Sequence, residues 1–215
     1  MQRRGMKPAR LRRTGFPVHP KFTHYEGSPA PARTELGLQP DRFTVLVTSG
    51  GVGSGNLGEL VHTLRNNFAD KQILVVTGKN QTLYQQLQRE ELGTNVHLYG
   101  FVDNMEMLMA ASDIVVTKAG PGTLMEALAM RRPAIVTEAV GMQERGNIDF
   151  VLNYELGAFC PTNERIVAAV QDLTDPQRYA ATVQRLADSV PRNGCLLYTS
   201  PSPRDRTRSR MPSSA

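Results

Sequence analysis

The sequence predicts an α/β fold with a doubly wound parallel sheet, and two observations support that prediction. Five short apolar segments rich in β-branched residues alternate with amphipathic segments of helical period, which is typical of right-handed βαβ crossovers. Glycine turns follow the first and fourth apolar segments, at the edge where such sheets bind ligands. Strands are expected at 43–48, 72–77, 95–99, 114–117 and 134–137. Helices are expected at 56–67, 82–92, 105–111, 124–130, 145–154, 163–173 and 175–188.

The turn after the fourth strand is the most informative segment. Gly120, Pro121 and Gly122 stop the strand, and the helix that follows leaves backbone N–H groups free at the carboxyl edge of the sheet. Because such groups bind phosphate, the turn predicts a site for a nucleotide diphosphate. Thr123 is expected as the N-cap, with Glu126 three residues further on. The same two residues also fit a capping box, a purely structural role that the tetrapeptide alone favours.

A second glycine loop, at 50–56, supports the binding alternative. Its candidate ligand-binding residues are Gly51, Gly53, Ser54 and Gly55, where the backbone can approach an anion closely. The loop also contains the G-x-G-x-x-G spacing of dinucleotide-binding oxidoreductases. Those enzymes place an acidic ribose ligand at the end of the second strand, whereas residues 78–80 are Gly-Lys-Asn here. An NAD-dependent enzyme is therefore the least favoured alternative.

Charge divides the 215-residue chain into three parts. Residues 1–42 carry a net charge of +6, are rich in Pro and Arg, and are expected to be a linker with a remnant of an interdomain region. Residues 43–194 carry −4, so the basic pI of about 9.5 belongs to the ends and gives no reason to expect nucleic-acid binding. Residues 195–215 resemble the translated read-through of a sequencing adapter, and we leave them out of the functional interpretation.

Other classes of protein are disfavoured by composition. No apolar run reaches the roughly 18 residues of a membrane span, and the first 13 residues lack the apolar region of a signal peptide. The two cysteines predict neither a disulfide framework nor a zinc site, and the four histidines have no metal-binding spacing. We therefore expect a cytoplasmic location, no metal and no cofactor.

Several motifs together carry a family resemblance over about residues 14–175. Their order is Thr-Gly-Phe-Pro-Val at 14–18, the glycine loop at 50–55, Gly-Phe-Val-Asp-Asn-Met at 100–105, Lys-Ala-Gly-Pro-Gly-Thr-x-x-Glu at 118–126 and Gln-Glu-x-x-Asn at 143–147. This set resembles the carboxyl-terminal donor domain of GT-B glycosyltransferases of the family 28 type. Monogalactosyldiacylglycerol synthases and bacterial diacylglycerol glucosyltransferases are the nearest members, and the peptidoglycan-precursor N-acetylglucosaminyltransferase is more distant.

The resemblance implies a Rossmann-like nucleotide-sugar-binding domain at 43–190 and a role for each motif. By that resemblance Val102 would hydrogen-bond uracil, with Met105 packed nearby, and Glu126 would accept hydrogen bonds from the ribose hydroxyls. The diphosphate would lie between Gly51–Gly55 on one side and Gly120, Gly122 and Thr123 on the other. Gln143 and Glu144 would contact the sugar, with Asn147 one turn beyond. The structural alternatives stay open: core positions for Val102 and Met105, and a solvated helix start for the other three.

The implied function is transfer of a hexose from a UDP-sugar to a membrane lipid such as diacylglycerol. Such enzymes carry the general base and the lipid acceptor site on an amino-terminal domain. We expect that domain to lie outside this sequence, so no catalytic residue is assigned here, and UDP-hexose binding at the membrane surface is expected of the chain. Three alternatives remain, namely a peptidoglycan-precursor type of transferase, a nucleotide-sugar 2-epimerase and the donor-binding subunit of a split transferase.

Two segments depart from the family pattern. Arg-Arg-Pro at 131–133 stands where a glycine commonly ends the helix, and Val-Gly-Met at 140–142 stands where Pro-Gly is common. The first raises a question about the helix end and the second about the sugar-facing loop.

Overall fold

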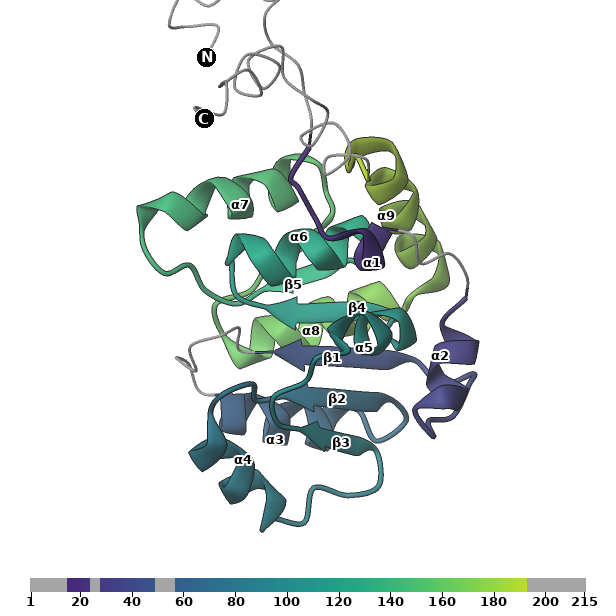
Figure 1. Cartoon of the computed structure of the whole chain (residues 1–215), viewed down its shortest axis with the longest axis vertical. Coiled ribbons are helices and arrows are strands. Elements are labelled where there is room, and N and C mark those ends of the chain that lie inside the picture. Colours follow the sequence, from purple (N-terminus) through teal and green to yellow (C-terminus); the bar gives the residue numbers. More distant parts are fainter. Residues whose placement is uncertain (1–14, 24–27, 49–56, 193–215) are drawn as a thin grey trace, which may run out of the picture.

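The predicted fold class is confirmed by a computed structural model, which describes residues 15–23, 28–48 and 57–192. Six parallel strands form one sheet in the order β3-β2-β1-β4-β5-β6 (Figure 1). The strands are β1 Thr44–Thr48, β2 Gln72–Val76, β3 Val96–Tyr99, β4 Ile114–Thr117, β5 Ala134–Val136 and β6 Gly157–Phe159. The chain winds outward in one direction from β1 to β3 and then in the other from β4 to β6. The topological switch point therefore lies between β1 and β4, where open α/β sheets bind ligands.

The register places the ends of the two central strands side by side. Val45 pairs with Ile114, Leu46 with Val115 and Val47 with Val116. The turn after β4 and the chain after Thr48 consequently leave the sheet from neighbouring points on the same edge. The glycine loop at 50–55 itself lies outside the described residues.

Side chains alternate between two apolar layers, because consecutive residues of a strand point to opposite faces. Val45 and Val47 face one cluster together with helices α3 and α8, whereas Leu46 faces another together with α5 and α6 (Figure 1). A third cluster joins α6, α7 and α9 beside β5. The described helices are α1 Pro20–Thr23, α2 Pro29–Glu35, α3 Leu57–Asn67, α4 Gln81–Gln88, α5 Met105–Ala111, α6 Pro121–Ala129, α7 Met142–Asn153, α8 Asn163–Thr174 and α9 Pro176–Ser189.

Among the differences from the sequence prediction, three concern α6, α7 and β6. Helix α6 begins at Pro121 rather than near Thr123, because proline supplies the fixed φ of a first helical residue and has no N–H to leave unpaired. Helix α7 begins at Met142, three residues early. Strand β6 was not predicted, since its three half-buried residues have no clear alternation. At its start Gly157 approaches β5 so closely that a Cβ would lie 1.9 Å from the carbonyl oxygen of Ala134.

The described part of residues 1–42, expected to be a linker, contributes to the core. Val18, Phe22 and Ala32 are buried and pack in the same cluster as α5 and α6. Helix α1 lies against α6, and helix α2 lies against α5 (Figure 1). The segment is therefore ordered by apolar packing, which its Pro- and Arg-rich composition had concealed.

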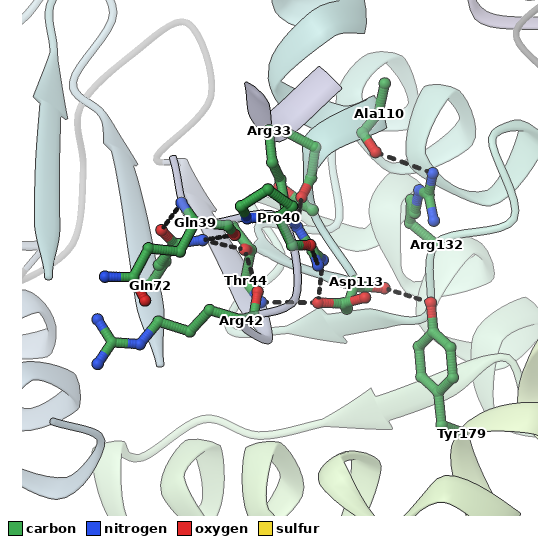
Figure 2. Close-up of polar contacts among 12 residues, drawn as sticks. Arg33, Gln39, Pro40, Arg42, Thr44, Gln72, Ala110, Asp113, Arg132 and Tyr179 are labelled. Atoms are coloured by element: carbon green, nitrogen blue, oxygen red, sulfur yellow. Dashed lines mark hydrogen bonds and ion pairs between the residues drawn. The ribbon is translucent and has the colours of Figure 1, made fainter. Parts of the chain in front are cut away.

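A buried polar network attaches α2 to the amino edge of the sheet (Figure 2), the edge opposite the turn at 120–122. Arg33 Nη2 pairs with Asp113 Oδ2 at 2.5 Å, and Arg33 Nε donates to the carbonyl oxygen of Ala111 at 2.8 Å. The backbone N–H of Thr44 donates to the same Asp113 oxygen at 2.7 Å. Because these groups are buried and mutually satisfied, they fix where β1, β4 and α2 meet.

Candidate functional site

The amino terminus of α6 offers two backbone donors at the switch point. Gly120 is the N-cap, Pro121 has no N–H, and the Leu124 N–H already donates to the Gly120 carbonyl at 3.3 Å. No side chain caps this helix, so the N–H groups of Gly122 and Thr123 remain for a ligand at the positive end of the helix dipole. Thr123 is the third helical residue, and its prediction as the N-cap was wrong.

That shift also removes the capping-box explanation for Glu126. The residue lies a full turn inside α6, out of reach of the helix start. Its carboxylate is half-buried, and no described residue provides it with a hydrogen bond or an ion pair within contact distance. Burial raises the pKa of Glu126, and Glu106 adds to the rise, while Lys21 and His19 oppose it. A half-buried carboxylate without a partner at a sheet's ligand edge is typical of a binding residue.

Helix α7 brings further predicted residues to the same turn. Asn147 Nδ2 donates to the carbonyl oxygen of Ala119 at 2.7 Å, and thereby holds the residue just before the Gly120 N-cap. Glu144 Oε2 accepts from the N–H of Val140 at 2.6 Å. Its other oxygen lies 3.8 Å from where a Cβ would stand on Gly120. Gln143 is exposed at the start of α7.

The departure from Pro-Gly at 140–142 is accommodated by this arrangement. Gly141 is the N-cap of α7 with φ 88°, a conformation that glycine adopts without strain. The Val140 N–H is occupied by Glu144, a bond that proline at that position would lack. The loop is thus closed by the side chain predicted to contact the sugar.

The loop after β3 carries Val102 and Met105, the predicted base-binding residues. Both are half-buried and pack against the cluster that includes Leu108 and Met109 of α5. The core alternative therefore describes part of their surface, while the rest faces solvent. Phe101 beside them is 65% exposed.

Two residues that were not predicted complete this neighbourhood. Lys21 of α1 pairs with Glu106 at 2.7 Å and donates to the carbonyl oxygen of Asp103 at 3.0 Å. Val18 and Phe22 are both buried, and this pair of apolar residues was the sequence signal that the basic segment packs on the domain. The assumption that residues 1–42 were linker obscured it.

Lys118 directly follows the last residue of β4. Its side chain is 11% exposed and pairs with Glu138 at 3.1 Å. Both line a cavity of about 380 Å³ at the ends of β1, β4 and β5, together with Thr48 and Thr137. None of the described predicted site residues lines this cavity. They lie instead at the start and first turns of α6, in the first turns of α7, and around the start of α5.

The structure thus places Gly120, Gly122, Thr123, Glu144 and Asn147 around one turn. Val102 and Met105 lie on the neighbouring loop, and Glu126 carries the charge that faces α1 and α5. Gly51, Gly53, Ser54 and Gly55 lie outside the described residues, so their part in the site stays a prediction. In the described ranges no group of three or more His, Cys, Asp or Glu side chains could hold a metal ion. No helix among those ranges has the length and apolar character needed to cross a membrane.

The fold and the turn at its switch point define a Rossmann-like domain of the kind found in GT-B glycosyltransferases. The model of the family described as "Glycosyltransferase family 28 C-terminal domain" matches residues 44–139. This part of the chain belongs to that family, and the resemblance drawn from the motifs is confirmed.

Curated relatives agree with the family. The probable monogalactosyldiacylglycerol synthase 2 of Oryza sativa subsp. japonica is 36% identical over 163 residues, which cover 73% of this chain and 35% of that protein. Monogalactosyldiacylglycerol synthase 1 of Arabidopsis thaliana is 31% identical over 182 residues, covering 81% and 34%. The chain therefore spans about a third of the length of these relatives.

Solved structures share the fold at low identity. WaaG, a glycosyltransferase involved in lipopolysaccharide biosynthesis, superposes with a TM-score of 0.63 at 17% identity, covering 90% of this chain and 56% of that chain. Os79 from O. sativa, solved in complex with UDP, gives a TM-score of 0.59 at 20% identity, covering 74% and 37%. At these identities the two structures establish the fold alone.

Proposed function

We propose that this chain is the donor-binding part of a UDP-sugar-dependent hexosyltransferase that glycosylates a lipid acceptor such as diacylglycerol. The observation that carries the proposal is the α6 terminus, where two backbone donors stand one helical turn from a carboxylate without a described partner. The names of the relatives, monogalactosyldiacylglycerol synthases, support the choice of a lipid acceptor. The complex of Os79 with UDP supports a uridine nucleotide as the ligand of this fold.

Each described group has a role suited to its chemistry. The N–H groups of Gly122 and Thr123 would donate to the diphosphate, where the helix dipole adds favourable charge. Glu126 would accept hydrogen bonds from the ribose hydroxyls with both carboxylate oxygens, which needs its ionised form. The loop carrying Val102 would receive the uracil edge, and Glu144 and Gln143 would contact the sugar hydroxyls.

In the reaction, an acceptor hydroxyl would attack the anomeric carbon of the hexose, forming the new glycosidic bond. The bond from that carbon to the diphosphate oxygen breaks, UDP leaves with the electron pair, and a general base takes the hydroxyl proton. Negative charge gathers on the diphosphate as the bond breaks. Donors fixed at the α6 terminus would stabilise that charge without reorganising, which is how preorganised sites lower barriers. We assign the base and the lipid site to a facing amino-terminal domain.

Titration of the 215-residue chain with UDP by isothermal calorimetry tests the proposal. We expect saturable binding that is weaker for thymidine diphosphate, since the deoxyribose lacks the hydroxyl that Glu126 would recognise. Glu126→Ala is expected to remove most of that preference, while Glu35→Ala, exposed at the end of α2 near the opposite edge, should leave it intact. No saturable heat at millimolar UDP would overturn the proposal.

A further inference from the structure

Lys21 makes three contacts that hold its ammonium group in one place. Nζ lies 2.7 Å from Glu106 Oε2, donates to the Asp103 carbonyl oxygen at 3.0 Å and stands 5.2 Å from the centre of the Phe22 ring. Phe22 is only 3% exposed and anchors α1 in the core. The lysine therefore extends from a fixed base.

The contacts of Lys21 fall on two successive pieces of the candidate site. Asp103 belongs to the loop at 100–104 that would receive the base, and Glu106 lies in the first turn of α5, next to Met105. One side chain consequently joins the loop to the helix it precedes. Because the interaction uses the Asp103 carbonyl, it constrains the backbone of the loop and not only a side chain.

The same ammonium acts on Glu126 from a third element. Helix α1 lies against α6 (Figure 1). Three charged or titratable groups act on the Glu126 carboxylate, namely Lys21 in α1, His19 just before α1, and Glu106 on α5. Lys21 and His19 favour the ionised carboxylate, and Glu106 disfavours it. Pairing with Lys21 also reduces the repulsion that Glu106 exerts on Glu126.

We propose that Lys21 is a positioning residue of the nucleoside site, which fixes the loop at 100–104 for the base and keeps a positive charge beside Glu126. This inference rests on the proposed function. It makes the segment that precedes β1 part of the nucleotide site, so base and ribose recognition both depend on a helix outside the 44–139 family match. Neither Lys21 nor Glu106 needs to touch the nucleotide for this role.

The expected effect is moderate because the Lys21 and Glu106 side chains are 38% and 27% exposed. Lys21→Met should weaken UDP binding by about 2- to 5-fold, as water screens a half-exposed pair. Lys21→Arg should recover most of the affinity. Arg178→Met is the matched control, since it removes an exposed cation paired with Asp172 on α8 and α9, far along the chain from the site.

Calorimetry of the whole chain with UDP and with uridine monophosphate distinguishes positioning from direct phosphate contact. We expect Lys21→Met to weaken both ligands by the same factor, with the Arg178→Met protein unchanged. The ratio of the mutant and wild-type Kd values should grow as the pH falls, because Glu126 then protonates earlier without Lys21. In a Glu126→Gln background that growth should disappear, which a merely structural role of Lys21 would not produce.

Hydrogen exchange on the ligand-free proteins tests the loop directly. Amides at 100–106 should exchange faster in the Lys21→Met protein than in the wild type and the Arg178→Met control. If the wild type binds UDP and Lys21→Met binds it with the same affinity, this inference alone is overturned. The same holds if Lys21→Met loses more affinity for UDP than for the monophosphate. A wild type that binds neither nucleotide would overturn the proposed function, and with it the role of Lys21 there.

Discussion

Replacing Arg33 by methionine should destabilise the domain far more than a surface mutation. Arg33 is 5% exposed, and its removal leaves Asp113, 9% exposed, without its ion-pair partner. It also removes the donors to the carbonyl oxygens of Ala111 at 2.8 Å and Pro40 at 2.9 Å. Breaking a buried pair from one side typically costs about 3–5 kcal/mol, because a charge is left desolvated. We therefore expect a loss in that range.

Burial raises the pKa of Asp113, against the Thr44 N–H, Arg33 and Arg132, which lower it. Without Arg33 the pKa rises further, so protonation limits the loss of stability. In Arg33→Met/Asp113→Asn the unpaired buried carboxylate is removed as well, and an amide oxygen can still accept from the Thr44 N–H. We expect that double variant to be more stable than Arg33→Met alone by about 1 kcal/mol or more.

Urea unfolding of the 215-residue proteins, followed by circular dichroism, measures these differences in the free energy of unfolding when the m-values of the variants agree. Arg178→Met, which removes an exposed pair, should change stability by less than about 0.5 kcal/mol. If Arg33→Met cost no more than that control, α2 would not dock on the sheet edge in solution. The account of residues 28–42 as part of the core would then be refuted.

Three further outcomes are expected. Gly157→Ala should lower the free energy of unfolding by about 2–4 kcal/mol, because the new Cβ would lie 1.9 Å from the Ala134 carbonyl oxygen. Gly146→Ala is the control and should raise stability slightly, because the space around Gly146 is open. Thermal melts that rank the two variants alike would contradict the close approach of Gly157 to β5. In urea unfolding, Arg131→Ala should lose about 1–2 kcal/mol more stability than Arg131→Gly. Both variants lose the guanidinium, but only glycine adopts the φ of 62° at this position without strain. Equal losses would show that the backbone there is not strained. The pKa of Glu126 is raised in the folded protein, so on acidification the affinity for UDP should begin to fall at a higher pH than that at which an ordinary glutamate protonates. A Glu126→Gln protein with the same calorimetric pH profile would refute this expectation.

The sequence predicted most of the sheet because its strands are buried on both faces. Such strands read as continuous β-branched runs, and Ile114–Thr117 was located to the residue. Strand β6 escaped since Gly157 is required by a close approach to Ala134, a tertiary constraint that no local pattern reports. The departure at 131 has a similar origin: Arg131 takes the left-handed conformation usual for glycine there and donates to the carbonyls of Leu186 and Val190 at the end of α9.

The candidate site was predicted where local chemistry determines it and missed where distant segments meet. Gly120 and Gly122 mark a strand-to-helix turn within one stretch of chain, so the turn itself signals the donors. Lys21 reaches Asp103 across 82 positions, and a lysine in a basic, proline-rich segment carries no sign of that partner. Only the apolar residues Val18 and Phe22, on either side of it, indicated that the segment packs on the domain.

The start of α6 decides between the two roles first considered for Glu126. Had Thr123 capped the helix, the glutamate would have been consumed in pairing with the helix start, and its conformation would need no ligand. With Pro121 as the first helical residue, Glu126 instead sits a turn deeper, where burial disfavours its charge and Glu106 opposes it. A carboxylate kept at such a position costs stability unless something it binds offsets the cost. The ammonium of Lys21 offsets part of it in the free protein, and the ribose hydroxyls of a bound nucleotide would supply the hydrogen bonds that no described residue provides.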